Sequence, residues 1–449
     1  MARPSQQLTH EDLDRARDRL RLSRARQAEL PRALRWTWVF WLLIGPGVLV
    51  FIGENDAPSM LSYLATGANF GVGFFLPFVI LTFLIAWIVQ EMTVRLGAVT
   101  HRGHAELIFD RFGPFWGWFA MADLTLGNFL TLVTEFIGVR AGLGFFGVPP
   151  LVSVALAVAV VIVASVTSRY WTWERMTLGL ALFNLIFIPV ALLAHADWGA
   201  VGHAFLTWGP LSGGFNSNTL LILVADIGAT VTPWMLFFQQ SAVSDKGLTT
   251  DDLKHGRIDT GLGALLATLA ACATVIATIP LFIHHISAGN FQAAQFAQAL
   301  EPYIGHFAAA LFALGIFEAG MVAAMTISSS SAYAFGEVAR TARSLNRPLR
   351  EGWPFYLVLV VIAGVAGALV LIPGAPLEYI VLIVNVIAVL AMPPALIFLY
   401  LLCKDPEVVG NLTTSPLQNV LISAVVVFLT GAGLFFAVTT LFPHLLPTA

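Results

Sequence analysis

Eleven long apolar stretches dominate this sequence and restrict what the chain can fold into. A helix that crosses a lipid bilayer needs about 20 mainly apolar residues, and each stretch reaches or approaches that length. The sequence therefore predicts an all-α membrane protein with eleven transmembrane helices. The stretches are 37–66, 74–97, 115–145, 151–168, 176–196, 218–243, 261–285, 305–336, 355–373, 378–402 and 417–442.

The composition agrees with this prediction. Of the 449 residues, 58% are apolar and 11% are charged, whereas a soluble domain carries about 25% charged residues. The connections are short, so we expect one transmembrane transport domain (36–449) after a cytoplasmic amino-terminal tail (1–35). That tail is Arg-rich and has no apolar core of a secretory signal. Its residues 8–30 suit a solvated segment or a short amphipathic helix on the inner leaflet.

The distribution of basic residues predicts the orientation. Cytoplasmic connections retain Lys and Arg. With the amino terminus inside, 22 of the 23 basic residues fall on the cytoplasmic side, and only Arg140 lies within a predicted span. An odd number of spans then places the carboxyl terminus outside. We expect a multi-pass protein of the cytoplasmic (inner) membrane with lipid around it.

Two of the stretches carry acids and a proline where a continuous apolar helix would have neither. The first contains Glu54, Asp56 and Pro58, and the sixth contains Asp226 and Pro233. An interrupted helix is tolerated in a membrane only where its free backbone groups line a cavity or bind something. Matching interruptions five spans apart predict an inverted repeat of 37–196 and 218–402, with the substrate between the halves and the eleventh helix appended.

Several segments resemble the Nramp (natural resistance-associated macrophage protein) family of proton-coupled divalent-metal transporters. They are Gly45-Pro46-Gly47, Met92–Thr100, Thr134–Gly138 and Gly228-Ala229-Thr230-Val231. The resemblance extends over nearly the whole chain. It implies a LeuT-like fold of five plus five helices with helices 1 and 6 interrupted, and transport of a divalent metal cation by alternating access.

The resemblance also implies a binding site, although its motifs differ from the family pattern. The usual Asp-Pro-Gly-Asn of helix one is here Asp56-Ala57-Pro58-Ser59, and the usual Met-Pro-His of helix six is Thr232-Pro233-Trp234. The family's coordinating glutamine aligns with Asn385. The implied ligands are the side chains of Asp56, Ser59, Thr232 and Asn385 and the carbonyl groups of Gly53 and Ala229.

These differences change the expected selectivity. The family's thioether ligand is replaced by Thr232, and an all-oxygen site suits hard ions, so discrimination against Mg²⁺ should weaken. We expect a cation of the Mn²⁺ or Mg²⁺ class, with Glu54 and Asp226 setting the local field. Asp226 could instead be a protonated acid bonded to a neighbouring hydroxyl. Trp234 could fill space, or attract a small organic cation through its ring face.

Proton coupling is the other property that the differences affect. Glu135 is retained, but Leu132 and Trp234 occupy the other positions that serve proton transfer in the family. Glu135 could shuttle a proton alone or form an ion pair with Arg140, five residues further on. Glu318 is a second acid within an apolar stretch, and its small neighbours also suit close helix packing.

The sequence thus favours a transporter of divalent cations. The alternatives are a transporter of a small organic cation on the same scaffold and a sensor that does not transport. We find no pattern of an enzyme, a cofactor, a nucleic-acid partner or an obligate protein partner, and the metal ion would be the substrate.

Overall fold

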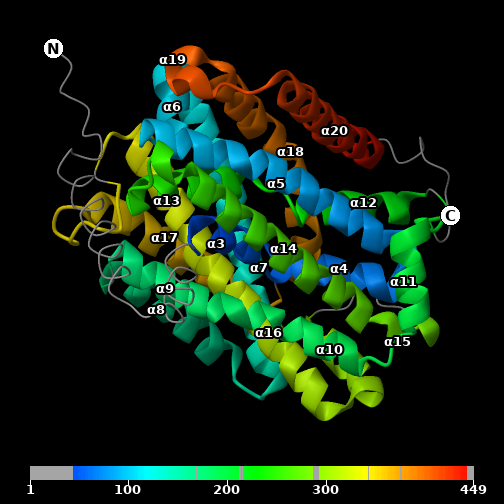
Figure 1. The fold of residues 1–449 in the computed structure, drawn as a ribbon. Helices are drawn as coiled ribbons and strands as arrows, with labels where there is room; N and C mark the ends of the chain where they lie inside the picture. Colours follow the sequence, from blue (N-terminus) through cyan, green and yellow to red (C-terminus); the bar gives the residue numbers. More distant parts are fainter. Residues whose placement is uncertain are drawn as a thin grey trace, which may run out of the picture.

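The structure is a computed structural model that describes residues 44–167, 169–211, 214, 216–286, 293–341, 343–374 and 377–441. The predicted amino-terminal tail lies outside these residues. Within them the chain forms helices and no strands (Figure 1). The all-α prediction is confirmed.

The helices follow one another along the chain in the predicted order. Three short helices, α6, α11 and α19, lie between the predicted spans. They are α3 (Pro46–Glu54), α4 (Ala57–Phe70), α5 (Phe75–Thr100), α6 (His104–Phe112), α7 (Pro114–Phe145), α8 (Pro150–Thr167), α9 (Tyr170–Ala181), η1 (Leu182–Ile186), α10 (Phe187–Leu193), α11 (Trp198–Thr207), α12 (Ser217–Gly228), α13 (Pro233–Lys246), η2 (Thr250–Asp252), α14 (Leu253–Ala277), α15 (Ile279–Ile283), α16 (Ala293–Val338), α17 (Trp353–Val370), α18 (Leu377–Lys404), α19 (Pro406–Val409), η3 (Gly410–Leu412) and α20 (Pro416–Leu441).

Among the described residues, ten helical segments are long and apolar enough to cross a membrane. They match the second to eleventh predicted stretches. In the place of the first stretch lie α3 and α4, each too short to be counted by length. The eighth stretch, predicted as 305–336, is part of a longer α16 in which Gly305 has a left-handed φ of +80°.

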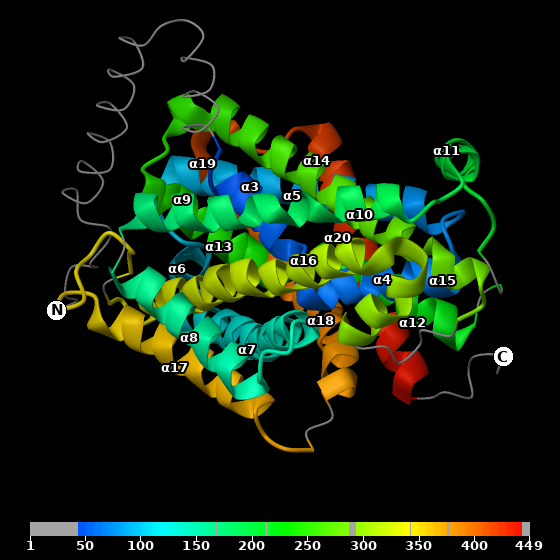
Figure 2. The same ribbon diagram turned by 90° about the horizontal axis from the view of Figure 1, so that it is seen from below.

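The interrupted helices lie inside the bundle and the last helix lies at its edge. The apolar window of α12–α13 is 83% buried and that of α20 is 22% buried. α3 and α4 run through the middle in both views, while Figure 1 shows α20 along one flank and Figure 2 shows α8 and α17 along another. The buried acids of the sequence are thus carried on central elements.

The first turn of α3 is fixed against α14 by close packing and by a buried carboxylate. A methyl group on Gly47 would come within 2.5 Å of the Thr260 backbone nitrogen, so only glycine fits there. Asp259 accepts hydrogen bonds from the backbone N–H groups of Gly45, Gly47 and Val48 at 2.8, 2.7 and 3.2 Å. A carboxylate at a helix N-terminus satisfies free donors and complements the helix dipole.

Close packing of α7 and α16 places the acid of α7 beside the first interruption. A methyl group on Gly142 would lie 2.6 Å from the Ala313 carbonyl oxygen, and one on Gly320 would lie 2.6 Å from the carbonyl oxygen of Glu135. Gly138 has the same relation to the side chain of Ala57. Small residues therefore let α7 approach α4 closely, which brings Glu135 to the start of α4.

Candidate cation site

The first interruption separates α3 from α4 at Asn55 and Asp56. Asp56 is the N-cap of α4, and its side chain accepts a hydrogen bond from the backbone N–H of Ser59 at 2.9 Å. Pro58 lies in the first turn of α4, where a missing N–H has no effect on the helix. The proline therefore begins the second helix, while the interruption itself lies two residues before it.

The second interruption has the same construction. Residues 229–232 separate α12 from α13, Thr232 is the N-cap of α13 and Pro233 is its first residue. The hydroxyl of Tyr63 donates to the carbonyl oxygen of Ala229 at 2.9 Å. The two interruptions therefore face each other across α4, and helix ends from both converge there.

Three buried carboxyl groups meet at this place. Glu54, Asp56 and Glu135 are 0, 2 and 0% exposed, and they act on one another electrostatically. Glu54 accepts from the Thr232 hydroxyl at 2.6 Å, and Glu135 accepts from the Ala57 backbone N–H at 3.0 Å. Within the described residues, none of the three forms an ion pair with Lys, Arg or His.

Asp226 is a fourth buried acid, and its side chain contacts α4 rather than the three carboxyl groups. Its two carboxyl oxygens accept from the hydroxyl of Thr66 on α4, at 3.1 and 2.9 Å. Its backbone carbonyl accepts from the Thr230 hydroxyl, four residues further on, at 2.7 Å. Asp226 therefore joins α12 to α4, and it shares the neighbour Tyr63 with Glu54 and Asp56.

Trp234 is buried at the start of α13, with 1% of its surface exposed. The edge of its ring reaches Gly53, where an added methyl group would lie 3.2 Å from ring atom Cη2. Its indole also interacts with Glu54, although its N–H has no partner in hydrogen-bond geometry among the described residues. The side chain therefore packs over the last turn of α3.

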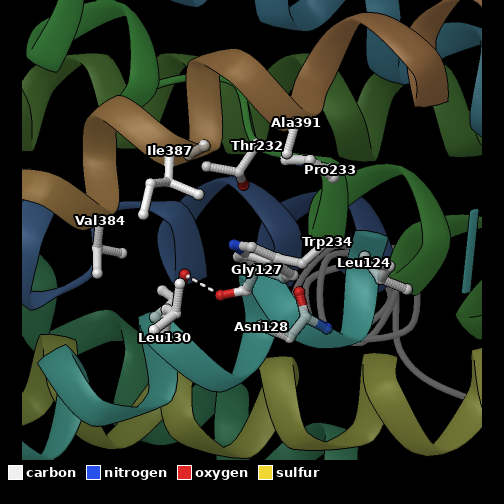
Figure 3. Close-up of a pocket in the computed structure, with 12 residues that line it drawn as sticks. Leu124, Gly127, Asn128, Leu130, Thr232, Pro233, Trp234, Val384, Ile387 and Ala391 are labelled. Atoms are coloured by element: carbon white, nitrogen blue, oxygen red, sulfur yellow. Dashed lines mark hydrogen bonds between the residues drawn. The ribbon is translucent and has the colours of Figure 1, made fainter. Parts of the chain in front are cut away.

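A pocket with an empty volume of about 300 Å³ borders this site. It lies between α7, the start of α13 and α18, and the indole of Trp234 projects into it (Figure 3). Most of its lining is apolar, and the polar members are Asn128, Thr131 and Thr232. The pocket borders the Thr232 end of the site.

Two of the predicted residues need separate comment. Asn385 belongs to α18, but its side chain lies outside the described part of the structure. The ion pair considered for Glu135 and Arg140 is absent from the described residues, because Arg140 donates to the carbonyl oxygen of Val370 at 3.0 Å. Five residues turn a helix by about 140° beyond a full turn, so the two side chains point to different faces.

The sequence reasoning missed Tyr63 and Thr66, which hold the second interruption against α4. A signal was present, because the polar residues Ser59, Tyr63 and Thr66 recur at i, i+4 and i+7 and so share one helix face. It also missed Asn55 as a bonded residue: its amide donates to Asn184 and to the Ala267 carbonyl. Nothing in the sequence connects those three positions.

Within the described residues, no three His, Cys, Asp or Glu side chains are arranged as a metal site. The carboxylates at the first interruption are instead engaged as helix caps and hydrogen-bond acceptors. A metal ion that binds there would need neutral oxygen ligands in addition to the carboxylates. Some of these hydrogen bonds would also have to be exchanged for bonds to the ion.

The chain is similar in sequence to a known family and to proteins of known function. The sequence model of the Nramp family, described as natural resistance-associated macrophage protein-like, matches residues 47–439. The divalent metal cation transporter MntH of Brucella suis is 29% identical over 294 residues, which are 63% of this chain and 64% of that protein, slightly less than two thirds. MntH of Staphylococcus aureus is 24% identical over 430 residues, which are 89% of this chain and 92% of that protein.

Solved structures share the fold. A manganese transporter of Eremococcus coleocola, crystallised with an aromatic bis-isothiourea compound, superposes with a TM-score of 0.71 at 19% identity, over 90% of this chain and 87% of that one. MhsT in complex with L-phenylalanine superposes with a TM-score of 0.56 at 15% identity, over 88% and 98%. The predicted LeuT-like fold class is confirmed.

Proposed function

Because this chain belongs to the Nramp family, we propose that it is a membrane transporter that carries a divalent metal cation by alternating access. The curated relatives are named divalent metal cation transporters, and the solved neighbour is named a manganese transporter. None of these proteins is named as an enzyme. The single observation that carries the proposal is the group of Glu54, Asp56 and Glu135 between two interrupted helices.

Buried negative charge at the first interruption supports cation binding. A carboxylate taken out of water into a low-dielectric interior loses several kcal/mol of hydration free energy unless a cation or hydrogen bonds replace it. Three such groups without a basic partner among the described residues form a site that favours added positive charge. A divalent cation that enters between α3–α4 and α12–α13 supplies it.

The ligands that we propose are all oxygen atoms. Asp56 would provide charge, and the hydroxyls of Ser59 and Thr232 and the amide of Asn385 would provide neutral ligands. The carbonyl groups of Gly53 and Ala229 would complete the set. Oxygen ligands suit Mg²⁺ and Mn²⁺, and Mg²⁺ would keep several waters because it dehydrates reluctantly.

Binding would replace hydrogen bonds that now hold the two interruptions. The Ala229 carbonyl accepts from Tyr63, and Glu54 accepts from Thr232. Rotation of these two hydroxyls would free oxygen lone pairs for the ion while the backbone remains in place. We propose that this exchange couples cation binding to the relative positions of the interrupted helices, and that the two halves then rock about the site.

Further properties form part of the same proposal. Glu135 would carry a proton if coupling is retained, since it is the one family proton residue present at its position. The single transport domain would lie in the cytoplasmic membrane, with its amino terminus in the cytoplasm, its carboxyl terminus outside and lipid on its outer helices. The positive-inside distribution of 22 basic residues supports this orientation.

A small organic cation is the second candidate, and one observation favours it. The pocket beside Thr232 is lined mainly by apolar residues and contains the indole of Trp234, whose ring face attracts cations. An organic ammonium or guanidinium ion would use this face together with Glu54. Trp234→Phe should then weaken its binding, because the phenyl ring is the poorer cation–π partner.

Calorimetry on the purified full-length protein separates these functions. We expect saturable heat from Mn²⁺ or Mg²⁺ that Asp56→Ala abolishes, with a matched variant, Asp123→Asn, that binds as the wild type does. Asp123 is a partly buried acid of α7 that is not among the proposed ligands. Heat from guanidinium or choline alone would instead support the organic cation. Binding without uptake in proteoliposomes would identify a sensor.

A further inference from the structure

A second buried polar cluster lies on the opposite side of the first interruption. The side-chain amide of Asn55 donates to the Asn184 amide oxygen at 3.0 Å, and the amide of Asn184 donates to Glu318 Oε2 at 3.3 Å. The Asn184 amide also reaches the backbone carbonyl of Asn55, at 3.4 Å. These three residues come from the α3–α4 interruption, from η1 and from α16.

The cluster contains oxygen atoms that lack hydrogen-bond partners. Asn55 Oδ1 and Glu318 Oε1 have none among the described residues, although the three side chains are at most 2% exposed. A buried oxygen without a donor costs about 1 to 3 kcal/mol, and more when it carries charge. The cost is relieved when a proton, an ion or an ordered water bonds to these atoms.

Within the part of the chain that the structure describes, no Lys, Arg or His forms an ion pair with Glu318, and its side-chain partner there is Asn184. The ionisable groups of the surrounding elements are occupied elsewhere: Glu54 by Thr232, Glu135 by Ala57 N–H, Arg140 by the Val370 carbonyl and Glu174 by Lys246. Asp56, which follows Asn55, caps α4.

The backbone is irregular at two of the three positions. Asn55 lies between α3 and α4, and Asn184 lies in η1, a 3₁₀ segment within the helix formed by α9 and α10. Irregular backbone at membrane depth is tolerated where it lines a cavity or binds something. Two such irregularities meet at Glu318, a carboxyl group with no basic partner among the described residues, and this arrangement points to a ligand.

The cluster is separate from the proposed metal site. Glu54 and Asp56 face α13, α7 and Tyr63, whereas Asn55 between them faces α14 and η1, where it also donates to the Ala267 carbonyl at 2.9 Å. The two sites therefore share the backbone of residues 54–56 while their side chains point apart.

We infer that Asn55, Asn184 and Glu318 form a second cation site, which takes one monovalent cation, a sodium ion or a proton. Glu318 supplies one negative charge, and the other groups supply neutral amide and carbonyl oxygens. One monovalent cation makes the cluster neutral, whereas a divalent ion would leave a buried positive charge. Sodium would lie among the amide and carboxyl oxygens, and a proton would reside on Glu318 Oε1.

Occupation of this site would affect the other one through the chain between them. Asn55 is fixed when its amide oxygen binds the cation, and this fixes the conformation in which Glu54 and Asp56 present their carboxylates. Binding at one site would then raise affinity at the other, and the coupling is reciprocal. The coupling role rests on the proposed transport function, whereas cation binding by the cluster does not.

The first test is thermal unfolding of the purified full-length protein in NaCl against N-methyl-D-glucamine chloride, whose cation is too bulky for the cluster, at constant ionic strength and at pH 5.5 and 8. A sodium-dependent rise in Tm that Glu318→Gln removes and Asp123→Asn retains would identify sodium. A Tm that ignores sodium, with a pH response that Glu318→Gln removes, would identify the proton. If wild type and Glu318→Gln respond alike to both, the inference is wrong.

A second variant covers the case in which Glu318→Gln does not fold. Asn184→Ala keeps the carboxyl group and removes one amide ligand, and we expect at least a tenfold higher sodium concentration, or a shifted pH midpoint, for half the effect. An unchanged midpoint would overturn the inference. Calorimetry with Mn²⁺ on the same samples keeps the two proposals apart, because loss of metal binding with the monovalent response intact contradicts only the transport function.

Discussion

At the scale of single residues, Thr232 decides which ions the proposed site can tell apart. Its hydroxyl donates to Glu54 at 2.6 Å and lies at the edge of the pocket. A hydroxyl oxygen suits hard ions such as Mg²⁺, whereas a thioether favours the softer ion. The single side chain at position 232 thus determines the ion selectivity of the proposed site.

We predict that Thr232→Met shifts preference from Mg²⁺ toward Mn²⁺. The thioether would favour Mn²⁺ by roughly tenfold in the ratio of dissociation constants, which corresponds to about 1.4 kcal/mol. Calorimetric titration of both ions measures this ratio. The control is Thr232→Val, which removes the hydroxyl without adding sulfur and should weaken both ions. An unchanged ratio in Thr232→Met would argue against Thr232 as a ligand.

His104 is a second residue whose environment has a measurable consequence. It begins α6, outside the membrane-spanning helices, and its ring nitrogens face Gln240 Oε1 and the Ala395 carbonyl at 3.2 and 3.3 Å. Burial lowers the pKa of His104 to about 4. The imidazole is therefore neutral in the folded protein at neutral pH, while in an unfolded chain it takes up a proton near pH 6.5.

The sign of the pH effect follows from this difference. As the pH falls from about 6.5 to about 4, the unfolded chain binds a proton at His104 that the folded protein does not, so stability decreases. We predict that His104→Gln removes this component, up to about 1.4 kcal/mol for each pH unit. Thermal unfolding between pH 7.5 and 5 measures it. The control is His203→Gln on exposed α11, and equal pH profiles for wild type and His104→Gln would contradict the prediction.

At the scale of elements, α3 is the helix that depends most on contacts outside itself. It has nine residues, too few to be stable alone, and its first turn is held by Asp259 of α14. Beside it, Lys246 of α13 bonds to the Ile44 carbonyl at 3.2 Å and to Glu174 at 3.0 Å. These buried charges join α3, α9, α13 and α14 at the amino-terminal end of α3.

We predict that Asp259→Asn loosens α3. An amide accepts fewer and weaker hydrogen bonds than a carboxylate and leaves Lys246 with less compensation, so backbone amides of residues 47–54 should exchange hydrogen at least about tenfold faster, for about 1.4 kcal/mol of lost local stability. Hydrogen–deuterium exchange measures this. Asp251→Asn, at an exposed position in η2, is the control, and protection equal to wild type would show that packing alone holds α3.

The elements also show what the sequence could predict. Apolar length predicted the spans, because the bilayer imposes it on each helix separately. An acid, a glycine and a proline within one apolar stretch indicated that Glu54 and Asp226 lie close to helix interruptions. The proline positions were less informative, since Pro58 and Pro233 begin helices and the interruptions precede them. The fifth predicted stretch starts six residues after the start of α9, because the first turns of α9 are polar, whereas the eighth starts at Gly305, where the backbone of α16 is non-helical.

At the scale of the whole molecule, the contacts that build the site join the two halves of the chain. Tyr63 meets Ala229, Thr66 meets Asp226 and Glu54 meets Thr232, at sequence separations of 166, 160 and 178 residues. No local pattern contains such pairings. The sequence could therefore indicate acids within apolar stretches, such as Glu54 and Asp226, but not that Tyr63 and Thr66 contact the end of α12.

This division between halves leads to a prediction about stability. The proposed ligands come from α3–α4 in one half and from α12–α13 and α18 in the other, so the site exists only in the assembled molecule. A ligand that binds only the folded state stabilises it by about 2.7 kcal/mol at 100 times its dissociation constant. We predict that Mn²⁺ raises the Tm of the wild type and of Asp123→Asn progressively, and that Asp56→Ala shows no such rise. A rise retained in Asp56→Ala would mean that the metal binds outside the interruptions, and it would remove the physical basis for placing transport there.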